Sequence, residues 1–129
     1  MPKKRQYKLD FIIKSSPTIL YNFLSTPSGL IQWFADHVDL NDKVFSFFWD
    51  ESEEKADIID LEENNFIRFR MQEAETEEEY FEFKIDKAEV TGDTILTVTD
   101  FSEEIDMEEN QRIWKTQIEV LRGRVGGAN

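Results

Sequence analysis

The sequence predicts an α+β domain in which a curved antiparallel sheet of about six to seven strands wraps around one long C-terminal helix. Three observations predict it. Apolar and polar side chains alternate through most of the chain, two helix starts containing proline follow the first alternating segment, and a broad apolar stripe at helical spacing occupies residues 107–121. The expected order is therefore a strand, two short helices, a run of strands and one long helix.

The first strand is expected at residues 7–13. Its side chains alternate between apolar and polar, so that Tyr7, Leu9, Phe11 and Ile13 share one face. This two-residue period is typical of a half-buried strand. One face of the segment therefore belongs to the predicted core.

Two short helices are expected directly after this strand. Ser16 is a suitable N-cap for a helix with Pro17 in its first turn, and Thr26 and Pro27 repeat the arrangement. Because proline inside a helix removes a backbone hydrogen bond, the second proline indicates two helices rather than one. The apolar residues at helical spacing are Leu20, Phe23 and Leu24 in the first helix and Leu30, Trp33 and Phe34 in the second.

From residue 36 onward the pattern changes to a period of two. Polar turns at residues 41–43, 63–65 and 91–93 separate segments rich in aromatic and β-branched residues. The expected strands are residues 37–40, 44–50, 54–62, 66–71, 80–85 and 94–101. Antiparallel strands joined in this way form a meander with one apolar face.

A long helix is expected at the C-terminal end. Asp106 and Glu109 have the spacing of a capping box, and Gly123, Gly126 and Gly127 are expected to end the helix. Its apolar stripe contains Met107, Trp114, Ile118 and Leu121. The aromatic face of the sheet must be covered, and this helix is the only element large enough, so the sheet should curl around it.

The opening of the chain resembles a known family. Residues 16–24, Ser-Pro-Thr-Ile-Leu-Tyr-Asn-Phe-Leu, and residues 26–34, Thr-Pro-Ser-Gly-Leu-Ile-Gln-Trp-Phe, are similar to the two opening helices of the START-like superfamily. This superfamily is also called SRPBCC or birch-pollen-allergen-like, and its architecture is the helix-grip fold. The resemblance is strongest to the branch of homologues of the activator of the 90-kDa heat-shock chaperone, and to small bacterial START-like proteins. It extends by element order from Tyr7 to about Arg124.

The resemblance implies where a ligand would bind, because in this fold the functional feature is usually a cavity between the sheet and the long helix. The candidate lining residues are Phe11, Trp33, Phe47, Trp49, Phe69, Phe81, Phe83, Trp114 and Ile118. Two alternatives stay open: these side chains fill the interior as core, or they surround a space of ligand size. The primary hypothesis is non-enzymatic binding of a small hydrophobic or amphipathic ligand.

The distribution of acidic residues supports an alternative hypothesis, a protein-interaction module. The chain has 129 residues and a net charge of −13, and residues 50–79 carry 13 acidic and three basic side chains. Such acidity argues against nucleic acid and anionic membranes as partners, because phosphate groups are bound by concentrated Lys and Arg. The acidic 50–79 surface could instead make the chain a protein-interaction module with a filled core. The strong like charge favours a monomer or at most a weak homodimer.

Composition indicates a single cytoplasmic domain spanning residues 1–129, with flexible tails at 1–6 and 125–129. No segment approaches the roughly 18 apolar residues of a membrane span, so no membrane insertion is expected, and the N-terminal residues do not resemble a secretory signal. The chain contains no Cys, which excludes disulfides, thiolate metal sites and Cys nucleophiles. Aromatic residues make up 13% of it, which argues against disorder.

No enzymatic activity, cofactor or metal site is expected. The single histidine, His37, follows Asp36, but neighbours on a strand point to opposite faces, so the pair cannot form part of a nucleophilic triad. Asp100 is aimed inward by strand parity from Leu96 and Val98, yet we expect it near water at the strand end. The remaining acids are expected on solvated surfaces, and no loop has the spacing of a calcium site.

Overall fold

The structure, a computed structural model, describes residues 3–125. It contains seven strands, two short α-helices after the first strand and one long C-terminal α-helix, which confirms the predicted class. The strands are β1 (Lys4–Ile13), β2 (His37–Asn41), β3 (Val44–Trp49), β4 (Ser52–Glu62), β5 (Phe66–Met71), β6 (Phe81–Lys87) and β7 (Thr94–Glu103). The helices are α1 (Pro17–Ser25), α2 (Pro27–Leu30) and α3 (Met107–Val125), with a 3-10 turn, η1 (Glu104–Asp106), before α3.

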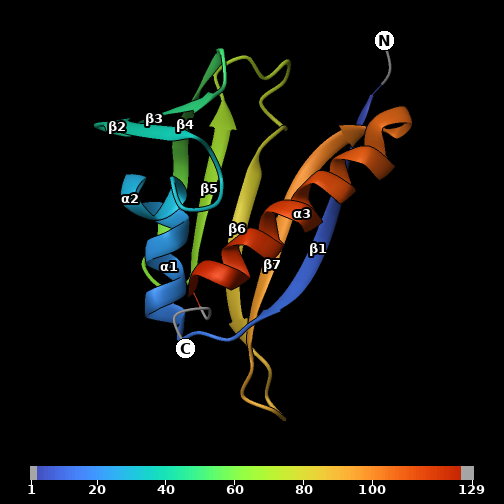
Figure 1. The fold of residues 1–129 in the computed structure, drawn as a ribbon. Coiled ribbons are helices and arrows are strands. Elements are labelled where there is room, and N and C mark those ends of the chain that lie inside the picture. The colour runs from blue at the N-terminus through green and yellow to red at the C-terminus, as the bar shows by residue number, and fades with distance from the viewer. Residues whose placement is uncertain (1–2, 126–129) are drawn as a thin grey trace.

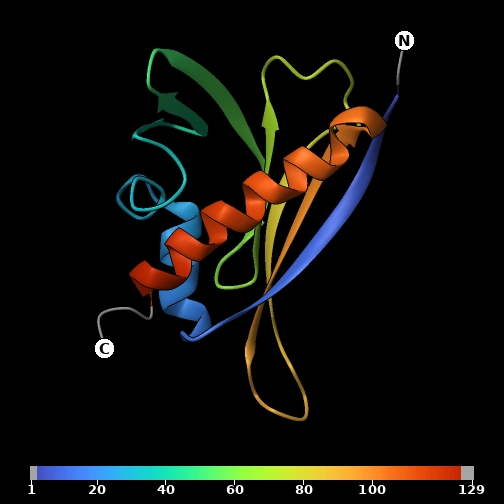
Figure 2. The same cartoon turned by 45° about the vertical axis from the view of Figure 1, so that its right-hand side comes forward.

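All seven strands belong to one antiparallel sheet with the order β1-β7-β6-β5-β4-β3-β2. The chain therefore meanders from β2 to β7, and β1 pairs with β7 at the other edge. Figure 1 shows α3 crossing in front of the sheet, while α1 and α2 lie beside β5 and the β2–β4 strands. The turned view shows the sheet curving around the helix (Figure 2). Within residues 3–125, none of the helices is long and apolar enough to cross a membrane.

Strand register places the apolar side chains on the concave face beneath α3. Ile67 lies opposite Phe83, and Phe83 in turn lies opposite Val98, and all three are at most 1% exposed. On the same face, nearer the β2 edge of the sheet, Phe45 lies opposite Ala56, and both are fully buried. The core is therefore a continuous apolar layer between the sheet and α3.

Both predicted helix caps are present at the start of α1 and α2. The Ser16 hydroxyl accepts a hydrogen bond from the Ile19 N–H at 3.2 Å, and the Thr26 hydroxyl accepts one from the Gly29 N–H at 3.0 Å. Each hydroxyl satisfies a backbone N–H that has no partner inside the helix.

The second helix is shorter than the spacing of Leu30, Trp33 and Phe34 predicted. α2 ends at Leu30, and residues 31–34 form turns instead. Trp33 and Phe34 are adjacent in sequence and both are buried. The chain leaves the helical path after Leu30, and the turns over residues 31–34 place both rings against the core.

The first strand is longer than predicted. It begins at Lys4, so residues 4–6, expected within a flexible tail, pair with Phe101–Glu103 of β7. Ion pairs of Lys4 with Glu79 at 2.9 Å and of Arg5 with Glu104 at 2.6 Å accompany this extension. Val125, also assigned to a tail, is the last residue of α3, and residues 1–2 and 126–129 lie outside the described residues.

Both ends of the last helix also differ from the prediction. α3 begins directly after Asp106, but the chain enters through η1, and within residues 3–125 no backbone N–H donates to the Asp106 side chain. The Glu109 side chain pairs with Arg112 instead of closing a capping box. Gly123 does not end the helix, which continues to Val125, and the Val125 side chain packs against the core. Gly126 and Gly127 lie outside the described residues.

Candidate functional site

Phe34 occupies the centre of the aromatic cluster beneath α3. It follows α2, and its side chain is only 5% exposed. Its ring contacts aromatic side chains of β3, β6, α3 and its own loop. The ring-centroid distances are 4.9 Å to Phe47, 5.4 Å to Trp33 and Trp49, 5.9 Å to Phe81 and Trp114, and 6.1 Å to Phe83. The Phe34 ring thus fills the space in which the resemblance implied a ligand cavity.

The nine expected lining residues divide between this core and its margins. All nine lie on the concave face or on the elements that cover it. The buried ones are Trp33, Phe47, Phe69, Phe81, Phe83, Trp114 and Ile118, whereas Phe11 and Trp49 are partly exposed. Trp33, Trp49, Phe81 and Trp114 line pockets at the surface. Phe47, Phe69, Phe83 and Ile118 pack within the core, and Phe11 packs against it.

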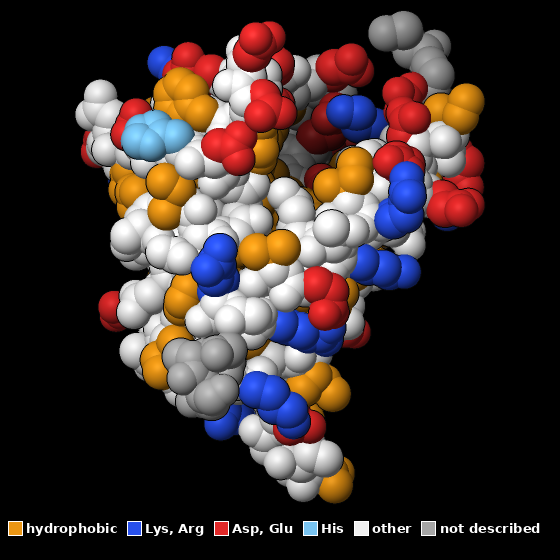
Figure 3. Space-filling view, in the orientation of Figure 1, with side chains coloured by type: hydrophobic (Ala, Val, Ile, Leu, Met, Phe, Trp, Pro, Cys, Tyr) orange, Lys and Arg blue, Asp and Glu red, His pale blue; other side chains and the backbone are white. Residues whose placement is uncertain are grey.

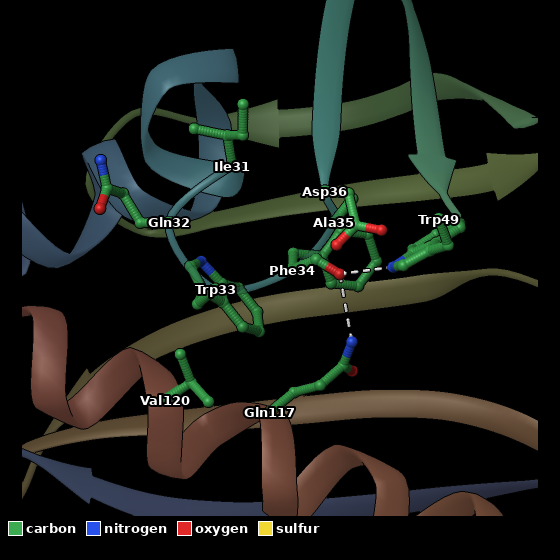
Figure 4. Close-up of a pocket in the computed structure, with 9 residues that line it drawn as sticks. All are labelled: Ile31, Gln32, Trp33, Phe34, Ala35, Asp36, Trp49, Gln117 and Val120. Carbon is green, nitrogen blue, oxygen red and sulfur yellow. Dashed lines mark hydrogen bonds between the residues drawn. The ribbon is translucent and has the colours of Figure 1, made fainter. Parts of the chain in front are cut away.

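One of these pockets, which we name the loop pocket, lies between the segment after α2 and the C-terminal half of α3 (Figure 4). Its volume is about 300 Å3. It is lined by Ile31, Gln32, Trp33, Phe34, Ala35, Asp36, Trp49, Gln117 and Val120. The pocket is open to the surface, and Ile31 and Val120 are exposed at its rim.

The Phe34 carbonyl joins three elements at the floor of the loop pocket. It accepts one hydrogen bond from Trp49 Nε1 of β3 at 2.7 Å and another from Gln117 Nε2 of α3 at 3.2 Å (Figure 4). Trp33 Nε1 donates to the Phe23 carbonyl of α1 at 2.8 Å. The two bonds to the Phe34 carbonyl hold the loop after α2 through its backbone, and the Trp33 bond holds it through a side chain. The position of Phe34 therefore does not depend on its ring alone.

A second pocket, which we name the mouth pocket, opens where the N-terminal half of α3 stands away from β3, β4 and β7. It has a volume of about 350 Å3, near the lower end of the range for ligand pockets. It is lined by Phe34, Trp49, Glu54, Asp100, Asn110, Ile113, Trp114 and Gln117. Figure 3 shows a hollow in the upper part of this face with Asp and Glu side chains around it. Its walls therefore combine apolar rings with carboxylate and amide groups.

Asp100 is a partly buried carboxylate of the mouth pocket. Its oxygens accept hydrogen bonds from Trp114 Nε1 at 2.9 Å, from the Phe101 N–H at 2.8 Å and from the Tyr7 hydroxyl at 3.3 Å. Strand parity correctly predicted its inward direction. The expectation that it lies at a watery strand end was wrong, because β7 continues to Glu103 and keeps Asp100 paired with Tyr7 of β1.

Burial raises the pKa values of both Asp100 and Tyr7. Loss of hydration raises the pKa of Asp100 above its usual value, while the bonds from Trp114, Phe101 and Tyr7 oppose the increase. Burial, and then the nearby Asp100 charge, raise the pKa of Tyr7, so this hydroxyl remains a donor.

We expect the substitution Asp100→Asn to change how stability depends on pH. The folded-state pKa of Asp100 is raised, so between the unfolded value near 4 and the folded value the native state binds more protons. The free energy of unfolding contributed by Asp100 therefore falls as pH rises. Relative to the wild type, Asp100→Asn should gain stability across this window, by at most about 1.4 kcal/mol per pH unit.

Urea unfolding of both proteins at several pH values between 4 and 7 measures this difference. Asp86→Asn, which removes an exposed carboxylate from β6, is the control for loss of one negative charge. A stability difference for Asp100→Asn that decreased with rising pH would contradict the assignment.

The single histidine lies outside these pockets. His37 Nε2 lies 3.1 Å from Asp39 Oδ1, and the Asp36 carboxylate accepts from the Asp50 N–H at 2.8 Å. The ring is exposed and lies beside Phe48, with 5.4 Å between ring centroids. Within residues 3–125, no three His, Asp or Glu side chains are grouped as metal ligands would be.

Several residues of the mouth pocket were not among the nine candidates, namely Phe34, Glu54, Asp100, Asn110, Ile113 and Gln117. A sequence signal existed for the helical ones, because Asn110 and Gln117 lie four residues before and three after Trp114 and therefore on its side of the helix. Glu54 lies two residues before the buried Ala56 and so on the same face of β4. For Phe34, the clue was its place in the Trp-Phe pair that ends the second opening segment.

Comparison with known proteins is consistent with this architecture. A family model described as a START-like superfamily domain matches residues 1–127. The solution NMR structure of a Bacteroides fragilis protein is 37% identical, with a TM-score of 0.68 over 93% of this chain and 90% of that one. No curated protein matches the chain.

Two more distant structures share the fold. The Aha1 dimer from Colwellia psychrerythraea is 18% identical, with a TM-score of 0.79 over 94% of this chain and 96% of that one. A Mesorhizobium loti protein is 14% identical, with a TM-score of 0.78 over 97% and 99%.

Proposed function

The chain belongs to the START-like superfamily, and from this membership and the pocket geometry we propose that it binds a small amphipathic ligand in the mouth pocket without converting it chemically. Folds of this superfamily commonly bind hydrophobic ligands. The observation that carries the proposal is an open pocket of about 350 Å3 between α3 and the sheet, with aromatic walls and a polar side. Such a combination orients a ligand that has one apolar and one polar end.

The proposed binding position lies at the mouth of the space between α3 and the sheet rather than at its centre. Phe34 and its neighbours occupy the centre, so a ligand there would have to displace a buried ring. At the mouth, Trp49 and Ile113 are partly exposed and offer apolar surface without rearrangement. Burial of that surface would stabilise a complex by about 25 cal/mol per Å2 of apolar area.

A neutral amphiphilic dye, N-phenyl-1-naphthylamine, tests the proposal. We expect saturable 1:1 binding, seen as enhanced dye fluorescence and confirmed by native mass spectrometry of detergent-free protein. Ile113→Trp, which fills the mouth pocket from a side chain that is 47% exposed, should weaken binding at least about tenfold, because the dye loses the volume it occupies.

Val120→Trp is the matched control on the same helix. Val120 is 43% exposed and lines the loop pocket but not the mouth pocket, so this variant should retain dye binding. Loss of binding in Val120→Trp with retention in Ile113→Trp would place the ligand in the loop pocket instead. Absence of 1:1 binding to the wild type would refute ligand binding at the mouth.

A protein interaction through the acidic 50–79 surface is the second candidate. Ten of the 13 acidic side chains in this range are exposed, and the other three are partly buried. A basic partner held by this surface would lose affinity when exposed glutamates such as Glu75, Glu77 and Glu78 are changed to Gln, and would be unaffected by Ile113→Trp. The two candidates therefore depend on different residues of the same chain.

A further inference from the structure

Glu54 is a carboxylate that faces the concave side of the sheet. In the β3–β4 register it lies directly opposite Phe47, which is fully buried, and two residues before Ala56, which is also fully buried. The Glu54 side chain itself is partly buried and lines the mouth pocket. Among the ion pairs formed within residues 3–125, none includes Glu54.

Asp100 places a second carboxylate in the same pocket from β7. The donors from Trp114, Phe101 and Tyr7 fix its orientation. Lys4 is a cation near this carboxylate, but its Nζ is 2.9 Å from the Glu79 carboxylate, which offsets its charge. None of the eight described side chains that line the mouth pocket is Lys or Arg.

The apolar walls of the pocket are aromatic. The Phe34 ring lies 5.4 Å from the Trp49 ring and 5.9 Å from the Trp114 ring, measured between centroids, so the three rings are in contact. Phe34 and Trp114 are buried, whereas the Trp49 indole is partly exposed. The face of an aromatic ring attracts a cation, and tryptophan does so most strongly. A partly buried carboxylate has lost part of its hydration, so an approaching positive group stabilises it.

From these features we infer that the mouth pocket selects amphiphiles with a cationic head group of the alkylammonium class over neutral or anionic amphiphiles of equal chain length. The head group would lie against Glu54, Asp100 and the partly exposed Trp49 indole, and the alkyl chain against Phe34 and Ile113. The inference rests on the proposed function and adds the ligand class to it. The net charge of −13 also raises the local concentration of cations near the pocket.

Displacement of N-phenyl-1-naphthylamine by three eight-carbon amphiphiles tests the selection at pH 7 and 0.15 M salt. The probes are octyltrimethylammonium, octanol and octanoate, which share a chain and differ in head-group charge. We expect octyltrimethylammonium to bind about tenfold more tightly than octanol, and octanoate to bind most weakly. Glu54→Gln should remove most of this preference, whereas Glu54→Asp, which keeps the charge, should retain it.

Glu53→Gln is the matched control, because Glu53 is the exposed neighbour of Glu54 on β4 and its loss changes the net charge equally. If Glu53→Gln reduced the preference as much as Glu54→Gln, total charge and not the pocket would select the ligand, and the inference would be overturned. Equal affinity for the three probes would also overturn it and leave the proposed function intact. Failure of the dye itself to bind would overturn both.

Discussion

Phe34→Ala is expected to lower the free energy of unfolding by about 3–5 kcal/mol, the usual effect of removing a buried phenylalanine side chain. The ring is 5% exposed and contacts rings from β3, β6 and α3, so its loss leaves a cavity where several elements meet. The backbone of residue 34 should stay in place, because Trp49 and Gln117 both donate to its carbonyl. Urea unfolding of the variant and the wild type measures the loss.

A cavity that persists in Phe34→Ala should accept an aromatic molecule, since apolar cavities made by truncation bind benzene. Saturating benzene should therefore raise the stability of this variant more than that of the wild type. Phe48→Ala is the control, because Phe48 is only partly buried, and its loss should lower stability by about 1 kcal/mol with no benzene effect. Equal losses for the two variants would contradict the central position given to Phe34.

Gly29→Ala is expected to have an effect of similar size for the opposite reason, which is lack of space. A Cβ atom on Gly29 would lie 2.1 Å from the Asn22 carbonyl oxygen and 2.5 Å from the Phe23 Cα. Both atoms belong to the backbone of α1, so no side chain can rotate away and the two helices must separate. We expect a loss of about 3 kcal/mol or more in the free energy of unfolding, at or above the upper end of the usual range for overpacking.

Gly123→Ala is the matched control for the chemistry of this substitution. Gly123 lies inside α3, and a Cβ atom there would have no neighbouring atom within 4 Å. Because glycine is a poor helix former, this variant should gain about 0.5–1 kcal/mol. Circular dichroism during thermal unfolding compares both variants with the wild type. A tolerated Gly29→Ala would show that α2 is not held closely against α1.

Much of the fold could be predicted because local signals agree with the final packing. Ser16 and Thr26 mark the two helix starts, and the aromatic alternation in strands such as β3 and β5 follows the pleat. The differences occur where tertiary contacts override local pattern. Pairing with β7 extends β1 to Lys4, and α3 continues past Gly123 to Val125, which packs against the core.

The site was harder to predict because it depends on how tightly the interior closes. Periodicity identifies which side chains point inward, and Phe47, Phe69 and Phe83 do point inward and are fully buried. It does not reveal that the loop after α2 turns and places Phe34 among them. That insertion fills the centre and leaves open space at the margins, where carboxylates such as Glu54 line the walls.

The order of the strands has a consequence for how separate molecules of this protein meet. β1 and β2 are the outermost strands, so each presents backbone groups that could pair with a strand of another molecule and begin a fibril. β2 is short, with five residues, and β1 carries charged side chains along its length. Arg122 also donates to the Ile12 carbonyl at 3.1 Å and occupies part of the open edge of β1. These features disfavour edge-to-edge growth, and with the strong negative charge they should keep the protein dispersed when it is concentrated.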